Sequence, residues 1–329
     1  MNLYFLVSEL HHLHYFISTE FPSGVSFYNS NFSRLKNTLR LRGFTYETSG
    51  ATVAEIVRRA EECGYCTEII HDSRENSVCG VIVPEMSLGV YFESEIYEKY
   101  DNVKREASAL FEEAKKIHDK QEEIYIKNTD FDRLNELGAV ATQMFFSVKK
   151  ETKAEIVGKD IHRFFGAMTT GGNVNYIKEL SLKTKNRYYI KGRPGTGKST
   201  FLKKLATAGI NAGYDVEMYH CALDPKSIDM IIVRELGLCV FDSTAPHEYF
   251  PERSGDGIID IYETCVVAGT DEKYATELEI LKEKYEACLV KGKENMKRYL
   301  NLIKEEERKK ASDKEVTDRL IGEIVTSYF

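Results

Sequence analysis

A glycine-rich segment in the second half of the chain carries the clearest chemical signal. Residues 192–200 read GRPGTGKST, so a glycine and four further residues precede Gly-Lys-Ser. Glycines let the backbone curl until several N–H groups point at one anion, and the following lysine can reach the β- and γ-phosphates of a nucleotide. The segment therefore predicts a phosphate-binding loop formed by Gly192, Arg193, Pro194, Gly195, Thr196, Gly197, Lys198, Ser199 and Thr200.

Such a loop should follow a strand and open a helix, because a helix N-terminus adds its dipole to the field at the phosphates. Residues 187–190 are a short β-prone run, and residues 201–206 have apolar residues at helical spacing. Residues 238–241 are apolar and end at Asp242, which predicts a carboxylate at the end of a neighbouring strand. We expect Ser199 and Asp242 to hold Mg²⁺.

The catalytic base is harder to assign, because no glutamate follows Asp242. Asp224 follows the apolar run 216–221, where metabolite kinases often place a base or a metal-binding carboxylate. Glu235 is a second candidate. His247 could sense the γ-phosphate or could cap a loop. The predicted catalytic residues are Lys198, Asp242, Asp224 and His247.

The landmarks around this loop occur a second time, 149 residues earlier. Residues 40–51 align with residues 189–200, Gly64-Tyr65 with Gly213-Tyr214, and His71 with His220. After a slip of one residue, residues 82–83 align with residues 232–233. An alignment of this length predicts two homologous repeats, at residues 10–155 and 160–329.

Each repeat should be a nucleotide-binding core followed by a charged helical arm, at about 94–150 in the first and about 270–329 in the second. The first arm has apolar residues at heptad spacing from Val103 to Ile124, a turn at 128–130, and a second helical pattern from Leu134 to Val148. The second arm has a helical pattern over 278–289, a break at Gly292, and a capping box at 312–315. Its many charges are typical of a solvated helix face, and docking of a partner protein is the alternative.

The first repeat lacks the groups that bind phosphate in the second. The counterparts of the lysine, of two loop glycines and of the metal carboxylate are Ser49, Tyr46, Thr48 and Phe92. The tyrosine and threonine side chains would crowd an anion nest. The first repeat is therefore predicted to be a pseudo-NTPase domain, and the chain to bind one nucleotide.

Length and composition set the class of protein. The chain has 329 residues, 42% of them hydrophobic, and a net charge of -7. These values are typical of a soluble protein of about two domains and disfavour a nucleic-acid binder, which usually carries a basic domain. The sequence shows no apolar run of about 20 residues and no convincing signal peptide, so we expect a cytoplasmic protein without membrane segments.

The cysteines and three of the arginines indicate less about function. Seven cysteines without a dense framework predict reduced thiols, and the Cys63–Cys66 pair is more simply two packing thiols than a metal or redox site. The candidate phosphate clamps, for which surface arginine is the default interpretation, are Arg193, Arg234 and Arg253.

The chain resembles a bacterial family with two tandem P-loop units, usually labelled as ATPase or nucleotide-kinase-like proteins. The resemblance rests on residues 163–166, 191–200, 213–217, 220–221 and 241–251 and covers nearly the whole chain. It implies P-loop NTPase folds and ATP binding. Family members usually keep the Gly-Lys-Ser loop in both copies, and this sequence departs from that pattern in the first.

The sequence thus predicts an α/β fold of two P-loop NTPase-like cores with mainly parallel sheets, each followed by a charged helical arm. Further strands are expected at residues 265–268, or at 15–17 and 164–168. The leading function is binding and slow hydrolysis of ATP with Mg²⁺ at the second repeat. Phosphoryl transfer to a small acceptor and nucleotide sensing with little turnover are the alternatives. A homo-oligomer and an unknown protein partner for the arms are left open.

Overall fold

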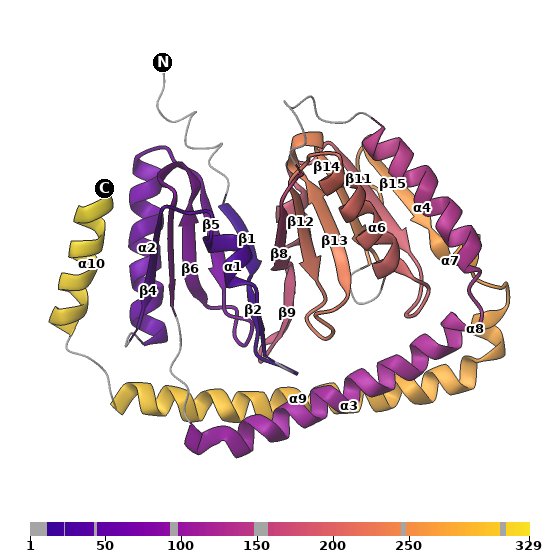
Figure 1. Cartoon of the computed structure of the whole chain (residues 1–329). Coiled ribbons are helices and arrows are strands. Elements are labelled where there is room, and N and C mark those ends of the chain that lie inside the picture. The colour runs from indigo at the N-terminus through magenta and orange to yellow at the C-terminus, as the bar shows by residue number, and fades with distance from the viewer. Residues whose placement is uncertain are drawn as a thin grey trace. The chain divides into compact units, whose positions relative to one another are not determined.

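The computed structural model describes residues 12–22, 24–42, 45–92, 98–147, 157–244, 248–309 and 314–329 (Figure 1). Two compact units are present, and neither is a continuous stretch of chain. Unit 1 comprises Met1–Ala107, Phe165–Leu180 and Lys293–Phe329, and unit 2 comprises Ser108–Phe164 and Ser181–Gly292.

Unit 2 is built on a mixed sheet in which most neighbours are parallel. β11 pairs in parallel with β14 and with β15, and β12 pairs in parallel with β8. β13 runs antiparallel to both of its neighbours, β12 and β14. The carboxyl ends of β11, β12 and β14 therefore lie at one edge. The strands, in spatial order, are β15 (Asp256–Asp260), β11 (Asn186–Lys191), β14 (Leu238–Asp242), β13 (Ile228–Val233), β12 (Val216–His220) and β8 (Asp160–Phe164).

Helices cover this sheet through one apolar core. α6 (Lys198–Asn211) packs on β13, and α4 (Phe131–Phe146) packs on α6. Fully buried side chains such as Phe201 and Leu205 face Ile231 and Val240 of the sheet and Leu134 of α4 in one cluster. Burial of each such side chain contributes about 1.5–3 kcal/mol. The short helices α7 (Ile261–Cys265) and α8 (Thr270–Lys273) follow β15.

The strands of unit 1 repeat this plan. β1 pairs in parallel with β5, β4 pairs in parallel with β7, and β6 runs antiparallel to β5 and β7. α2 (Tyr46–Glu62) packs on β6, and α10 (Lys314–Tyr328) packs on α2. The sheet strands, in spatial order, are β1 (His12–Phe16), β5 (Thr67–His71), β6 (Val78–Val83), β7 (Leu88–Phe92) and β4 (Asn37–Leu41). The smaller elements are β2 (Ser18–Thr19), β3 (Val25–Ser26), α1 (Tyr28–Phe32), β9 (Gly166–Thr169), β10 (Gly172–Asn175) and α5 (Ile177–Ser181), whose last residue falls in unit 2.

The elements of the two halves recur at the spacing seen in the sequence. β4 begins at Asn37 and β11 at Asn186, which is 149 residues later. β6 begins at Val78 and β13 at Ile228, which is 150 residues later, so the one-residue slip falls between them. The register shift before His71 in the β5–β6 pair recurs before His220 in the β12–β13 pair. The halves thus share element order, pairing and a local irregularity.

Each repeat has one antiparallel strand among parallel ones, β6 in the first and β13 in the second, because a short turn joins that strand to its neighbour. The 3-10 turn η3 (Pro84–Met86) joins β6 to β7, and η5 (Arg234–Leu236) joins β13 to β14. Each turn is followed by a left-handed residue, Ser87 or Gly237. Such short connections can only join antiparallel strands.

The two helices and the turn predicted in the first arm are present, but α4 turns away from α3 and does not form a packed hairpin with it (Figure 1). α3 (Asp101–Ile126) buries Ala107, Ala114, Ile117 and Ile124 of the predicted stripe. Asp130 caps α4 by accepting hydrogen bonds from the N–H groups of Asp132 and Arg133.

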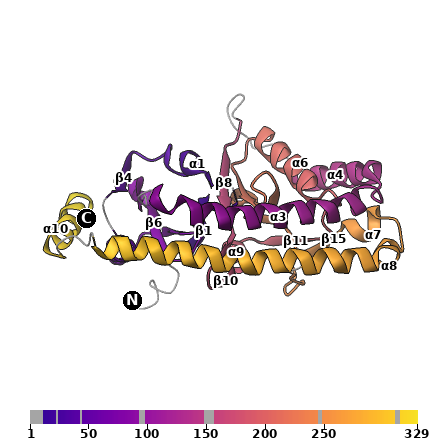
Figure 2. The same cartoon turned by 90° about the horizontal axis from the view of Figure 1, so that it is seen from below.

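The break predicted at Gly292 is wrong, since α9 (Ala275–Lys309) runs through it. A Cβ at Gly292 would lie 3.0 Å from Phe111 of α3, so the glycine allows close packing of α9 on α3 within unit 2. Figure 2 shows the two long helices side by side. Ser312 and Asp313 of the predicted capping box lie outside the described residues.

One helix of each arm packs on the core of the other repeat. α4 follows the first core along the chain, yet it packs on α6 of the second. α10 follows the second core and packs on α2 of the first. The compact units therefore do not coincide with the predicted segments 10–155 and 160–329, because the apolar face of α4 completes the unit 2 core.

Several smaller expectations can be checked. Residues 265–268 form no strand, since Cys265 ends α7, and the further strand is β15. The alternative is partly right, because β1 and β9 overlap residues 15–17 and 164–168. All seven cysteines are free thiols. Among the described helices, none is long and apolar enough to cross a membrane.

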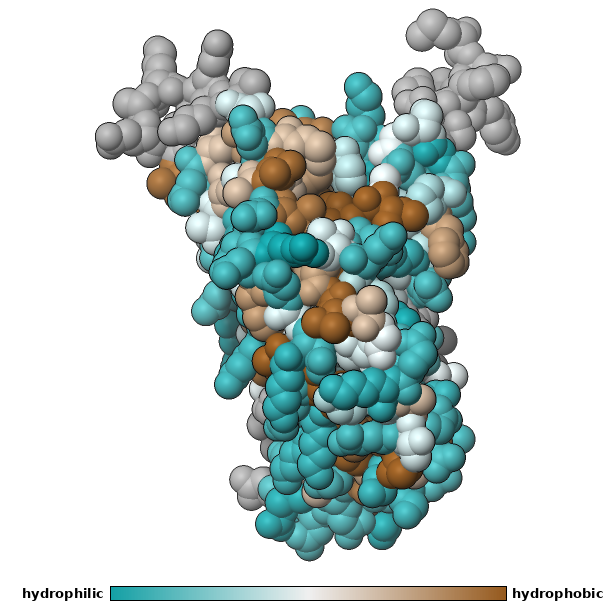
Figure 3. Space-filling model, turned by 90° about the vertical axis from the view of Figure 1, so that its right-hand side faces the viewer, coloured by the Kyte–Doolittle hydropathy of each residue, from teal (hydrophilic) through white to brown (hydrophobic). Residues whose placement is uncertain are grey.

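On the face of the molecule that Figure 3 shows, hydrophobic residues lie in groups separated by hydrophilic ones. Val140 and Met144 of α4 are 64% and 54% exposed. Partner docking through the arms stays a prediction.

Candidate functional site

The predicted phosphate loop lies at the carboxyl end of β11 and opens α6. Gly195 and Gly197 have φ values of +82° and +86°, a left-handed conformation that favours glycine. Thr196 is fully buried and holds the turn, since its Oγ1 donates to the Arg193 carbonyl at 2.8 Å. Gly197 is the N-cap of α6 and has no side chain to bond the first N–H groups of the helix. These donors are the ones that a phosphate would use.

Lys198 lies in the first turn of α6 with its ammonium group turned back over the loop. Nζ donates to the Arg193 carbonyl at 2.8 Å and lies 3.5 Å from Asp242 Oδ2. Both side chains are largely buried, with 10% and 20% exposure. The lysine therefore stands between the loop and the strand-end carboxylate, where phosphate oxygens would replace its present partners.

The residues predicted to hold Mg²⁺ are brought to the same edge. Ile190 of β11 is paired with Asp242 of β14, and Asp242 accepts a hydrogen bond from Thr244 Oγ1 at 2.7 Å. Ser199 Oγ accepts one from the N–H of Ile228, at the start of β13, at 2.9 Å. Because Ser199 Oγ is the acceptor in this bond, its own hydroxyl proton points away from the Ile228 N–H.

Asp229 of β13 is a site residue that the sequence reasoning missed. Burial raises its pKa to about 7, and the negative charge of nearby Asp242 adds to the rise. A second carboxylate beside Asp242 gives an oxygen-rich donor set with Ser199, which suits a hard cation such as Mg²⁺. The signal was available, because Asp229 is the acidic residue inside the otherwise apolar run 228–233.

Arg193 connects the loop to two helices. Its Nη2 lies 2.9 Å from Asp271 Oδ2 at α8, and its guanidinium lies 4.8 Å from the centre of the Tyr262 ring. Asp271 Oδ1 accepts a hydrogen bond from the Tyr125 hydroxyl in the last turn of α3 at 2.8 Å. The last turn of α3 is thereby tied to the loop.

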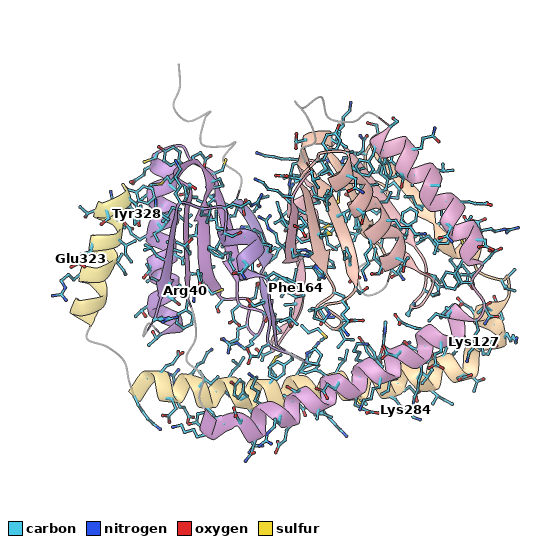
Figure 4. All side chains as sticks on the ribbon, in the orientation of Figure 1. Arg40, Lys127, Phe164, Lys284, Glu323 and Tyr328 are labelled. Carbon is cyan, nitrogen blue, oxygen red and sulfur yellow. The ribbon has the colours of Figure 1, made fainter. Side chains whose placement is uncertain are left out.

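The end of α3 lies directly on the loop. α3 stops at Ile126, just before Lys127, which is labelled in Figure 4. A Cβ placed on Gly195 would clash with the Glu122 carbonyl oxygen and lie 2.7 Å from the Glu122 Cα. Only glycine at position 195 permits this approach.

One face of α3 carries titratable groups toward this edge. Lys115, His118, Asp119 and Glu122 are three or four residues apart and therefore share a face. Lys115 Nζ lies 2.9 Å from Asp119 Oδ1 and 3.6 Å from Asp224 Oδ2, and His118 Nδ1 lies 3.7 Å from Glu122 Oε1. One ligand atom each from His118, Asp119 and Glu122 lies within 4.8 Å of the others. Sequence analysis treated this helix only as an arm.

The remaining candidates fall into three groups. Asp224 follows β12 at the same edge as Asp242, where it faces Lys115. Glu235 lies in η5, at the opposite end of β14 from Asp242, so it cannot be the base. His247 lies outside the described residues.

Two of the candidate arginine clamps have structural partners instead. Arg234 Nη2 lies 2.8 Å from the buried carboxylate of Glu217. Arg253 bonds Asp256 and the carbonyl of Leu182. Of the three arginines, only Arg193 lies at the loop.

The equivalent region of the first repeat has a different backbone. α2 begins at Tyr46, the counterpart of Gly195, so the sequence that forms the loop in the second repeat forms the first helical turn here. Thr45 caps this turn, because its Oγ1 accepts from the N–H of Thr48 while Thr48 Oγ1 accepts from the N–H of Thr45. The prediction that Tyr46 and Thr48 crowd an anion nest is therefore wrong. The described backbone here is helix and forms no nest, and the Tyr46 side chain lies outside the description.

Comparisons with protein-family models, curated proteins and solved structures gave no match.

Proposed function

We propose that unit 2 binds ATP with Mg²⁺ and hydrolyses it at one site per chain. The observation that carries this proposal is the geometry of the loop. A strand, two left-handed glycines and an uncapped helix N-terminus place Lys198 3.5 Å from the strand-end Asp242. A chance glycine loop would not need that carboxylate within reach of its lysine.

Each group has a defined task in this proposal. The first N–H groups of α6 bind the phosphates, and Lys198 leaves the Arg193 carbonyl to pair with the β- and γ-phosphates. Mg²⁺ would be held by Ser199 and Asp242, with Asp229 behind them, and would neutralise charge on the transferred phosphoryl group. Arg193 is held by Asp271 at the loop, where its positive charge adds to the field.

Two other functions use the same site. Phosphoryl transfer to a small acceptor would use Asp224 as base, and its place at the same edge as Asp242 favours that alternative over Glu235. A nucleotide-sensing module would bind ATP and barely turn over. Release of ADP that depends on an added acceptor identifies a kinase, and partner capture with ATP but without turnover identifies a sensor.

The test is calorimetric titration of the full chain with a non-hydrolysable ATP analogue and Mg²⁺. We expect a stoichiometry near one and loss of measurable binding in Lys198→Ala. The matched control is Lys203→Ala, which removes an exposed lysine from the same helix and should bind as the wild type does. A stoichiometry of two, or equal binding by Lys198→Ala and the wild type, would place nucleotide elsewhere and remove the proposal.

A further inference from the structure

Hydrolysis at this site needs a group that positions water and takes its proton. The second repeat supplies Lys198 and Asp242 for the phosphates and metal, but Ser243, fully buried, follows Asp242 where many ATPases have a base. Asp224, the candidate from the sequence, faces Lys115 at 3.6 Å, and its Oδ1 accepts a hydrogen bond from the N–H of Lys226 at 3.2 Å.

α3 offers a carboxylate at the loop itself. The backbone of Glu122 is in contact with the space above Gly195, and Tyr125 in the next turn is tied to Arg193 through Asp271. The helix is thus fixed on the loop at both Glu122 and Tyr125. The Glu122 side chain extends along the face that also carries His118, and its Oε1 lies 3.7 Å from His118 Nδ1.

The electrostatic setting agrees with this placement. Burial raises the pKa of Glu122, and the charges of Asp119 and Asp224 raise it further, while Lys115 and Lys198 oppose the rise. Burial lowers the pKa of His118, so the imidazole beside Glu122 tends to be neutral. A carboxylate with a raised pKa is a better proton acceptor near neutral pH than an ordinary surface glutamate. Lys115 on the same face of α3 lies 3.6 Å from Asp224, which follows β12, so this face of α3 lies at the edge where the loop stands.

We propose that Glu122, on the arm of the first repeat, is the base that activates water at the ATP site of the second repeat. The inference rests on the proposed ATPase function and deepens it. It also explains why the arm of the first repeat lies against the second core, because that core alone would bind nucleotide without a base.

The step balances without a further reagent. A water oxygen bonds to the γ-phosphorus while the bond from that phosphorus to the β–γ bridging oxygen breaks. Glu122 accepts the water proton, ADP leaves with the electron pair of the broken bond, and the proton is later released to solvent. General-base positioning of this kind typically contributes 10²–10⁴-fold in rate.

The experiment compares Glu122→Gln with the wild type in full-length protein. We expect the affinity for the ATP analogue to change by no more than a few fold and the rate of phosphate release to fall by about a hundredfold or more. Turnover of the wild type should also decline as pH falls through the raised pKa of Glu122, since the base must be ionised, and the variant should lose this acidic limb. A structural role would not remove the limb.

Matched variants separate the outcomes. Glu123→Gln changes the next residue, which is 66% exposed, and should hydrolyse at the wild-type rate. Glu122→Asp retains a carboxylate and should recover part of the rate if folding is intact by thermal melting.

The proposal is overturned if Glu122→Gln hydrolyses ATP as fast as the wild type does. It is also overturned if Asp224→Asn abolishes turnover and Glu122→Gln does not. It is also overturned if the wild type binds ATP without hydrolysing it. Failure of the wild type to bind nucleotide overturns both proposals, whereas normal binding with a fast Glu122→Gln variant overturns only this one.

Discussion

The two repeats place a helix N-terminus after the same strand and use it in opposite ways. In unit 2 the N-cap of α6 is Gly197, whose φ of +86° directs the chain through a loop and leaves the first N–H groups without a side-chain cap. In unit 1 the N-cap of α2 is Thr45, whose side chain forms a capping box with Thr48. A helix whose first N–H groups are bonded by its own side chains has few donors left for an anion, so the two repeats differ in the donors that they leave open at this helix end.

The side chains near the N-terminus of α6 also differ from their counterparts near α2. Lys198, Asp229 and Asp242 of the second site have Ser49, Cys79 and Phe92 as counterparts, and all three counterparts are buried. Burial raises the pKa of the Cys79 thiol, and the charges of Asp72 and Arg74 act on it. The Asp72–Arg74 ion pair, 2.7 Å long and buried, therefore lies near the position that Asp229 has in unit 2. The first repeat thus has an internal ion pair where the second has two neighbouring carboxyl groups, Asp229 and Asp242.

Other features have not diverged. His71 at the end of β5 donates from Nδ1 to the Asn76 carbonyl, and its Nε2 lies 2.9 Å from His14 Nδ1. His220 at the end of β12 donates to the Pro225 carbonyl, and its Nε2 lies 2.8 Å from His162 Nδ1. The pair is present in both repeats, so it does not depend on the Gly-Lys-Ser loop, which only the second repeat has.

The largest effect is expected at Asp242, whose counterpart in the first repeat is Phe92. Asp242→Asn should lower metal-dependent turnover by about a hundredfold, or ~3 kcal/mol in activation free energy, while the loop and Lys198 still bind the phosphates. The measurement is the ATPase rate per folded molecule, with nucleotide affinity and thermal melting alongside.

Asp260→Asn is the matched control for Asp242. Asp260 also ends a strand at this edge, but its Oδ1 caps α7 by accepting from the N–H of Glu263 at 2.8 Å. We expect a stability loss of about 1 kcal/mol and wild-type turnover from this control. If Asp242→Asn behaves in the same way, Asp242 is a strand-end cap and the two repeats differ less than proposed.

The next prediction concerns the shared histidines. Burial lowers the pKa of His71 and of His220 to about 4, below the value of 6.5 for an exposed histidine. Between these pH values the unfolded chain binds protons that the folded chain does not. The stabilising effect of each neutral histidine is therefore complete above about pH 6.5 and is lost as the pH falls toward 4. From pH 7 to pH 5 each histidine should cost about 2 kcal/mol of unfolding free energy.

Urea unfolding at pH 7 and pH 5 tests this expectation. His71→Gln and His220→Gln should each reduce the difference between the two pH values by a similar amount, whatever their stability at pH 7. If only His220→Gln reduces this difference, the histidine pair contributes to pH-dependent stability in unit 2 alone.

Much of the fold follows from local sequence patterns. The heptad stripe of α3 and the cap at Asp130 depend on neighbours along the chain, so periodicity and capping chemistry were sufficient to predict the two helices and the turn between them. The strand ending at Asp242 is a continuous apolar run. The offset of 149 and 150 residues locates the equivalent elements before any coordinates are known.

What the sequence did not predict depends on contacts between distant residues. β15 has only two aliphatic residues between its aspartates and is a strand because it pairs with β11, from Arg187 opposite Asp256 onward. The exchange of arms could not be inferred either, since the apolar stripe of α4 would suit either core. With the first arm assigned to the first core, Glu122 could not be connected with the loop.

The smallest expected effect tests the closed helix end of the first repeat. Thr45→Ala removes the side-chain half of the capping box and leaves the N–H of Thr48 without its acceptor, while the bond from the Thr45 N–H to Thr48 Oγ1 can remain. The cost should be about 1 kcal/mol of unfolding free energy. Thr207→Ala is the control, because Thr207 is exposed in the interior of α6 and alanine is the better helix former there, so this variant should be neutral or slightly stabilised. Thr45→Ala should gain no nucleotide binding, since the α2 backbone still runs through the sequence of the loop. If Thr45→Ala is as stable as the wild type, the first turn of α2 is not held by its cap, and the contrast between the two helix ends would then rest on backbone conformation alone.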